Sequence, residues 1–292
     1  MEKNNLYIHN SKDLTIKKSD PLSKFLNILV HISAAITFCV LIFLIGYILV
    51  NGVPNLSADL FSIHYNSTNV SLLPATFNTL VIIVISLAIA VPIGIFSAIF
   101  LVEYAKKGDK TVALIRLMTE TLSGIPSIIY GLFGMIFFVT TLRMGYSILA
   151  GSLTLSIMIL PLIIRTTQEA LKAVPDSLRE GSFGLGAGKL RTISKVVLPS
   201  CLPAILSGVI LAIGRIVGES AALIFTAGSV ADFPNDLFSP GRTLAVHMYA
   251  ISTEGFHMDK AYATAVVLLV IVLFINFVST KIAKNLENGG TN

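Results

Sequence analysis

Charged residues and tryptophan are scarce in this sequence of 292 residues. Asp, Glu, Lys and Arg make up only 13% of it, about half of their usual share in a soluble domain, and Trp is absent. Hydrophobic residues make up 54%, and the mean hydropathy is +0.82. This composition excludes an ordinary water-soluble enzyme and a disordered chain.

The sequence also lacks the motifs for cysteine-based metal or redox sites and for nucleotide binding. Cys39 and Cys201 are the only cysteines, and they form neither a C-x-x-C pair nor a metal-binding spacing. We interpret both as small apolar core residues. The sequence contains no G-x-x-x-x-G-K-[ST] loop to bind nucleotide phosphates, so we expect no bound cofactor and no ATP chemistry in this chain.

What the sequence does contain is six long apolar runs. Each is long enough to cross a bilayer, and each must be helical because lipid offers no partners for backbone N–H and C=O groups. The expected fold class is an all-α membrane protein with six transmembrane helices in a domain of residues 25–284. A polar arm (residues 1–24) precedes this domain and a short tail (285–292) follows it. The expected spans are residues 25–50, 77–101, 117–142, 147–164, 203–225 and 262–282.

The distribution of Lys and Arg predicts the orientation of these spans. Seventeen of the 21 basic residues fall in the N-terminal arm, the tail and the loops after spans two and four. Only Arg143, Arg242 and Lys260 fall in the loops on the other side, and Arg215 lies inside a span. The positive-inside rule therefore places both termini of this multi-pass membrane protein in the cytoplasm. The net charge of +5 is then a topology signal, and no nucleic-acid partner is needed to explain it.

Two connections are longer than a simple helix bundle needs. The external segment 227–261 contains an apolar piece, Leu244–Ile251, which is too short to cross and predicts a surface or re-entrant helix. The cytoplasmic segment 165–202 is rich in charge and glycine. Within it, Pro175 is expected to open one short helix, and Gly184 to stop or bend it. A second helical stretch is expected to end at Leu198–Pro199. The alternative is a solvated connector.

The spacing within this cytoplasmic segment resembles the signature loop of the permease subunits of ABC importers. The matching positions are Glu180, Gly186, Val196, Leu198 and Pro199. The sequence departs from the family pattern at Gly181 and Ser182, where the family has two alanines, and at Val196, where it has Ile. The resemblance implies a type I importer permease whose cytoplasmic loop docks into a groove on an ATPase subunit.

Two ionisable residues in the fifth span are candidate functional groups, because a charge at mid-bilayer costs at least a few kcal/mol. Arg215 and Glu219 are four residues apart and would share one face of a continuous helix. One interpretation is a self-neutralised structural pair. The other is an anion site on a translocation path, since Arg presents a planar fork of donors that suits a tetrahedral oxyanion.

The third span carries further polar candidates for the path. Pro126 is expected to bend this helix, and Ser123, Ser127 and Tyr130 would satisfy the freed backbone groups or face water. Glu120 lies near the cytoplasmic end, where it would reach water or meet a cation from another helix.

These stretches of spans three and five narrow the resemblance to the phosphate-specific branch of the ABC permeases. The residues concerned are Ser123–Ser127 with Tyr130-Gly131, and Gly214–Ala221. The resemblance implies an importer of inorganic phosphate, built from this permease, a sister permease and two ATP-binding subunits that hold ATP and Mg²⁺. It also implies an extracytoplasmic phosphate-binding protein that delivers the substrate.

Three other functions stay open. One is an ABC permease for another oxyanion or small solute, because the cytoplasmic loop would fit it equally well. A second is an autonomous secondary transporter or channel that uses Arg215 and Glu219. The third, an intramembrane enzyme, has the least support, because His31 is the only His or Asp within a span and no metal pair is present.

Overall fold

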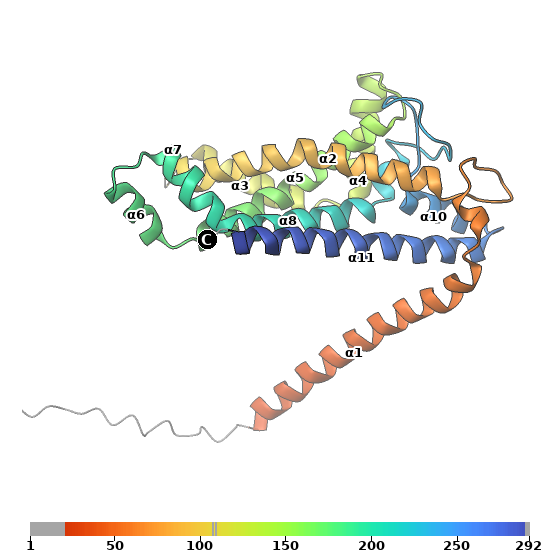
Figure 1. The fold of residues 1–292 in the computed structure, drawn as a ribbon, viewed down its shortest axis with the longest axis horizontal. Coiled ribbons are helices and arrows are strands. Elements are labelled where there is room, and N and C mark those ends of the chain that lie inside the picture. Colours follow the sequence, from red (N-terminus) through yellow and green to blue (C-terminus); the bar gives the residue numbers. More distant parts are fainter. Residues whose placement is uncertain (1–20, 107, 109, 290–292) are drawn as a thin grey trace, which may run out of the picture. The chain divides into compact units, whose positions relative to one another are not determined.

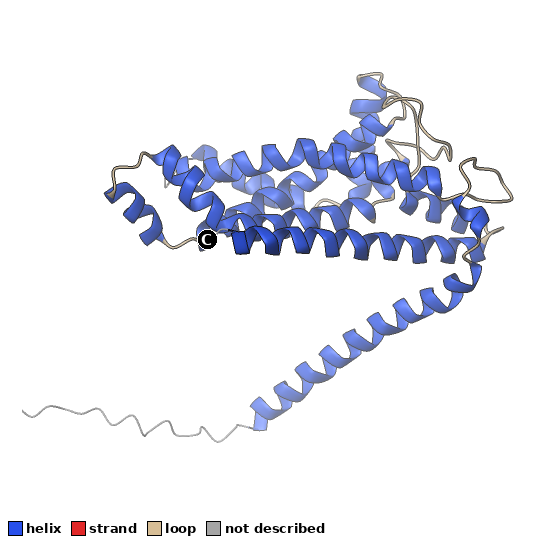
Figure 2. Cartoon of the chain, viewed as in Figure 1, coloured by secondary structure: helices blue, strands red, loops and turns tan. Residues whose placement is uncertain are grey.

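A computed structural model describes residues 21–106, 108 and 110–289 of this chain. Its described residues form helices, turns and loops, with no strand among them (Figure 2). Most of the expected N-terminal arm, together with Lys107 and residues 290–292, lies outside this described part. The chain divides into two units, one ending at Ile48 and the other beginning at Leu49.

The first unit consists of a helix, α1 (Pro21–Gly52), whose last turn belongs to the second unit. Its side chains are exposed along almost its whole length, and most of them are large and apolar. Such a surface is typical of a helix that meets lipid or another subunit rather than water.

Four long helices form the body of the second unit: α2 (Leu73–Ile99), α5 (Ile148–Ala173), α8 (Leu198–Val217) and α11 (Met258–Gly289). They lie side by side along one direction (Figure 1), with α5 packed on α2 and α8, and α8 packed on α11. The centre of the core is on α5, where Leu155, Ile159 and Ile163 are at most 1% exposed. A helix that is apolar around most of its surface is expected at such a central place.

Shorter helices complete the second unit: α3 (Lys110–Ser123), α4 (Ser127–Gly134), α6 (Asp176–Gly184), α7 (Lys189–Thr192), α9 (Ala221–Ile224) and α10 (Leu244–Glu254). Wider π-helical turns follow α2 (Phe100–Tyr104), α4 (Met135–Thr141) and α7 (Ile193–Val197). Two 3₁₀ turns, Val53–Asn55 and Ala58–Phe61, lie between α1 and α2.

The helices long and apolar enough to cross a membrane number five in the described residues, or six if the bent pair α3 and α4 counts as one span. The expected third span, 117–142, is therefore not one continuous helix. The helix of the fourth span runs beyond the expected end at Ile164 to Ala173, because Thr167, Ala170 and Leu171 continue its buried face.

The two ends of the bundle differ in charge. Helices α6 and α7 lie at one end, and α10 lies at the other (Figure 1). The basic connections around α3, α6 and α7 belong to the first end, which we call the α6 end. At the opposite end, α10 packs on α11 and α2 and begins with a cap in which Thr243 Oγ1 accepts the Val246 N–H. This is the short helix expected over Leu244–Ile251.

Candidate functional site

The third span is broken rather than bent. Its two halves, α3 and α4, make an angle of 104° across residues 124–126. Pro126 has no N–H to continue the helix, so carbonyls of the last turn of α3 lose their partners. The Tyr130 hydroxyl donates to the Leu122 carbonyl at 2.7 Å, and Ser123 donates to the Glu120 carbonyl at 2.7 Å. Ser123 and Tyr130 thus satisfy backbone groups at the break, whereas Ser127 has no hydrogen-bond partner among the described residues.

The fifth span also stops within its apolar run, at Val217 instead of Phe225. Glu219 lies after this end, so the expectation that it shares a helix face with Arg215 is wrong. Its Oε1 accepts the Ala222 N–H at 3.0 Å and caps the short helix α9. The Glu219 side chain is buried, and no ion pair within 4.0 Å joins it to Arg215.

The two breaks pack against each other. A Cβ added at Gly131 of α4 would lie 2.8 Å from the Ala222 Cα of α9, which is closer than real Cβ atoms approach. One turn later, a Cβ at Gly134 would meet the side chains of Thr154 and Thr226. The Tyr-Gly pair of span three and the segment after Glu219 are therefore neighbours, and only glycine allows their backbones to come this close.

Arg215 lies in the last turn of α8 and lines a groove between α5, α8 and α11 with a volume of about 550 Å³. The carbonyl end of α8 provides partial negative charge beside this cation. Among the described residues, Arg215 has no carboxylate partner within 4.0 Å. The other lining residues are Leu162, Ser207, Ile210, Leu211, Gly214 and Asn276.

Sequence reasoning missed two polar residues of this groove, Ser207 and Asn276. Asn276 is flanked by apolar residues within α11, and Ser207 stands in the apolar run of α8. A polar side chain inside a membrane span tends to face the protein interior or a polar path, so both positions carried a signal that could have been used.

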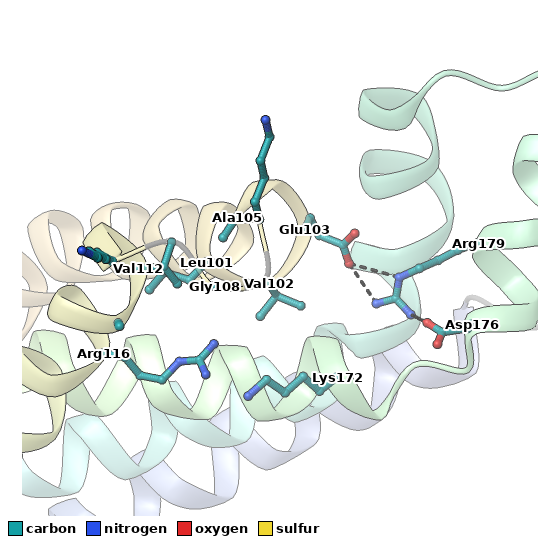
Figure 3. Close-up of a pocket in the computed structure, with 13 residues that line it drawn as sticks. Leu101, Val102, Glu103, Ala105, Gly108, Val112, Arg116, Lys172, Asp176 and Arg179 are labelled. Atoms are coloured by element: carbon teal, nitrogen blue, oxygen red, sulfur yellow. Dashed lines mark hydrogen bonds and ion pairs between the residues drawn. The ribbon is translucent and has the colours of Figure 1, made fainter.

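The α6 end holds the best-defined ion pair of the described residues. Arg179 Nη2 lies 2.8 Å from Glu103 Oε1, and Arg179 Nη1 lies 3.1 Å from Asp176 Oδ1 (Figure 3). The same guanidinium donates to the carbonyls of Leu171 and Val174, each at 2.8 Å. These bonds connect α6 to the end of α5 and to the turn after α2, and we call Arg179, Glu103 and Asp176 the Arg179 clamp.

The matching positions of the signature loop lie between α6 and the start of α8. Glu180 is exposed on α6, and Gly186 adopts φ +81° in the joint between α6 and α7, a conformation that favours glycine. Val196, Leu198 and Pro199 follow α7. The expectation that a second helix ends at Leu198–Pro199 is wrong, because π-helical turns carry the chain on into α8. Pro199 stands in the first turn of α8, where proline needs no N–H partner.

Apolar side chains around the joint face outward. Leu185 is 91% exposed and Leu190 72%, and no residue of α6 is buried. Apolar groups exposed beside Glu180 are typical of a surface that another protein covers.

Comparison with known proteins identifies this architecture. A family model for the "binding-protein-dependent transport system inner membrane component" matches residues 90–289. The chain belongs to this family. The matched segment includes both broken spans, the Arg215 groove and the signature loop.

Individual members are similar over most of their length. The chain is 36% identical to the probable ABC transporter permease protein YqgI of Bacillus subtilis, over 83% of this chain and 88% of YqgI. It is 34% identical to the phosphate transport system permease protein PstA of Mycobacterium leprae, over 69% of this chain and 67% of PstA.

A solved structure shares the fold of this family member. One chain of a bacterial ABC transporter involved in the import of the acidic polysaccharide alginate superposes with a TM-score of 0.62 at 19% identity. The match covers 88% of this chain and 96% of that one. The all-helical fold expected from the sequence is thus that of an ABC importer permease.

Proposed function

We propose that this chain is the membrane-spanning permease subunit of an ATP-driven importer of inorganic phosphate. The observation that carries the proposal is the Arg215 groove, in which a half-buried guanidinium stands within an apolar span without a carboxylate partner among the described residues. A charge in such a place needs an anion or a polar path to offset its desolvation. Relatives named PstA support phosphate as that anion.

In this proposal the α6 end faces the cytoplasm of a bacterial cell, and both termini lie on that side. The basic residues around α3, α6 and α7 support this orientation through the positive-inside rule. The α10 end would then face an extracytoplasmic phosphate-binding protein, and the exposed apolar surface of the spans would meet membrane lipid and a sister permease.

The proposed assembly contains a PstA-like chain, its PstC-like sister and two copies of an ATP-binding subunit. ATP and Mg²⁺ would be bound by the ATP-binding subunits. The surface around Glu180, with Leu185 and Leu190, would dock on one of them, and the Arg179 clamp would pass its movement to α2 and α5. The spans would then tilt so that the path opens alternately to the two sides.

Arg215 would meet the phosphate anion during its passage, and the amide of Asn276 would donate a further hydrogen bond. The Ser207 hydroxyl donates to the Pro203 carbonyl at 3.1 Å, so its oxygen would accept a hydrogen bond from a protonated phosphate. The path would also include Glu120, Ser123, Ser127 and Tyr130 of the broken third span. No carboxylate of the described residues lies within 4.0 Å of Arg215, so none competes directly with phosphate for this guanidinium. Glu219 accepts the Ala222 N–H through Oε1, and its charge would select phosphate over sulfate, because only phosphate carries a P–OH donor at neutral pH.

The experiment is uptake of radiolabelled phosphate, with labelled sulfate in parallel, in phosphate-starved cells whose own copy of this chain is replaced by variants. We expect Arg215→Gln to reduce phosphate uptake at least tenfold, because it removes charge-assisted hydrogen bonds worth about 1.5–3 kcal/mol. The control Lys281→Gln changes an exposed cation of α11 that does not line the groove and should keep uptake within twofold. Unchanged phosphate uptake in Arg215→Gln cells would contradict the proposal that Arg215 meets phosphate on the translocation path.

A second variant tests the selection of phosphate. Glu219→Gln keeps an oxygen that can accept the Ala222 N–H but removes the negative charge. We expect the preference for phosphate over sulfate to fall while the variant still reaches the membrane. An unchanged preference would remove Glu219 from the proposal and leave Arg215 in it.

A further inference from the structure

The largest cavity described at the α6 end is separate from the Arg215 groove. It has a volume of about 740 Å³ and lies between the turn after α2, α3, the end of α5 and the start of α6 (Figure 3). Apolar residues such as Leu101, Val102 and Val112 form part of its wall, and basic residues form much of the rest.

Among the described residues that line this cavity, cations outnumber carboxylates. Its acidic residues, Glu103 and Asp176, both bind Arg179. The other cations that line it have no carboxylate within 4.0 Å among the described residues; they are Lys106, Lys110, Arg116 and Lys172.

Two of these cations face each other. Arg116 of α3 and Lys172 of α5 extend toward one another across the space between their helices (Figure 3). Both also line an adjoining hollow of about 320 Å³ that contains Glu120 and Glu169. Glu169 pairs with Arg165, and Glu120 forms no ion pair within 4.0 Å among the described residues. Both residues are exposed, and the repulsion between two like charges that face each other falls when an anion lies between them.

We infer that this cavity binds a phosphoryl group between Arg116 and Lys172. The guanidinium offers two parallel N–H donors to phosphate oxygens, and the ammonium adds a compact positive charge. A cavity at the ends of membrane helices with one apolar wall suits the headgroup of an anionic phospholipid, which could lay its glycerol against Leu101 and Val112. Free inorganic phosphate offers the same oxygens.

This inference does not rest on the proposed transport function. A phospholipid headgroup would bind here whatever solute the protein moves, and free phosphate would bind here without passing Arg215. The two can therefore fail separately: uptake tests Arg215, and direct binding tests Arg116 and Lys172.

The test is equilibrium binding to the purified full-length chain in a non-ionic detergent, with two separate probes. One probe is radiolabelled phosphatidylglycerol in micelles that contain an excess of phosphatidylcholine, whose choline neutralises its phosphate. The other is radiolabelled inorganic phosphate, measured on wild-type protein and on Arg215→Gln so that binding in the groove is recognised. Saturable binding of the first probe identifies a lipid site, and saturable binding of the second that survives Arg215→Gln identifies a site for free phosphate.

The variants decide whether the cavity is responsible. We expect Arg116→Gln and Lys172→Gln each to weaken binding about tenfold, as loss of one charge-assisted contact does. The control variants Arg191→Gln and Lys195→Gln change exposed cations that do not line the cavity and should stay within twofold. Arg116→Lys and Lys172→Arg keep the charge and should recover much of the affinity, which separates loss of a ligand from loss of fold.

Three results would overturn the inference. One is no saturable binding of either probe. Another is binding that Arg116→Gln and Lys172→Gln leave unchanged. The third is an equal loss in the control variants, which would show a non-specific response to net charge.

Discussion

Two arginines with little exposure, one at each end of the bundle, are held in opposite ways. At the α6 end, the Arg179 side chain is 14% exposed and binds two carboxylates and two backbone carbonyls. At the α10 end, Arg242 is 5% exposed and stacks over the Tyr65 ring at 4.7 Å. Its Nε and Nη2 have no hydrogen-bond partner among the described residues, and no carboxylate lies within 4.0 Å.

This difference gives the two arginines different roles, one mechanical and one electrostatic. A guanidinium with four partners on three elements links those elements mechanically, so movement of α6 must pull on α5 and on the turn after α2. Within the described part of the chain, the Arg242 guanidinium, which stacks on an aromatic ring, forms no side-chain hydrogen bonds through Nε and Nη2 that would connect helices. Its positive charge nevertheless acts on neighbouring groups. The fully buried His247 ring lies beside Tyr65 and feels that charge.

The largest expected effect is that of breaking the Arg179 clamp. Arg179→Met leaves Glu103 largely buried without a cation and removes the donors to two carbonyls. We expect the free energy of unfolding to fall by about 3 kcal/mol, the usual range for removing one partner of a buried ion pair. Thermal unfolding of the purified chain in detergent, followed by circular dichroism, measures this change.

The matched control for the clamp is Arg191→Met, which removes an exposed arginine with no ion pair among the described residues. A double-mutant cycle of Arg179→Gln with Glu103→Gln isolates the coupling between the two side chains. Equal destabilisation by Arg179→Met and Arg191→Met, or a coupling energy near zero, would show that the clamp links nothing.

The second effect is a pH dependence at the α10 end. Burial and the charge of Arg242 lower the pKa of His247 from 6.5 to about 3. The unfolded chain therefore binds a proton below pH 6.5 that the folded chain refuses until about pH 3, and stability falls as the pH falls through this window. Each pH unit removes about 1.4 kcal/mol, or about 2 kcal/mol between pH 7 and pH 5.

Thermal unfolding at pH 7 and pH 5 measures this dependence in wild type and in His247→Gln, which cannot take up the proton. The dependence should be much weaker in His247→Gln and preserved in His64→Gln, which changes an exposed histidine of the loop before α2. A wild-type unfolding temperature that is the same at both values would refute the buried neutral imidazole.

The third effect is that of replacing the arginine at the α10 end by methionine, as Arg179→Met does at the α6 end. Arg242→Met removes a buried charge without leaving a carboxylate behind, and methionine refills part of the space. The lost cation–π contact and the relieved desolvation offset each other, so we expect a change within about 1 kcal/mol of zero. A loss as large as that of Arg179→Met would show that Arg242 has a partner that the described residues do not provide.

Much of the fold could be predicted because the bilayer allows few solutions. Long apolar runs must be helices, and their length predicted that helices would span the membrane and that Leu244–Ile251 would form a helix too short to cross it. The breaks were harder to predict. The local sequence does not show why α8 ends at Gly218 but continues through Gly214. The end of α8 depends on the tertiary contact between Gly131 and Ala222, which a local sequence pattern does not reveal.

The candidate sites could also be predicted only in part. Arg215 was identified because a charged residue inside an apolar run can be recognised from the sequence alone. The expectation that Glu219 shares a helix face with Arg215 depended on a continuous helix and was wrong, because α8 ends at Val217. The Arg179 clamp was missed because Glu103 lies 76 positions away, and no periodicity within α6 reveals a partner on another helix.

The smallest effect on stability belongs to the residue next to Arg179. Glu180 is exposed on α6 and has no ion-pair partner among the described residues, so Glu180→Lys should change the free energy of unfolding by less than about 0.5 kcal/mol. If Glu180 meets an ATP-binding subunit, the reversed charge should still reduce co-purification of that subunit several-fold. Lys281→Glu reverses an exposed charge of α11, outside the proposed docking surface, and serves as the control. Normal co-purification with Glu180→Lys would remove Glu180 from the docking surface, whereas a loss of co-purification together with a loss of stability would mean that α6 itself had come apart.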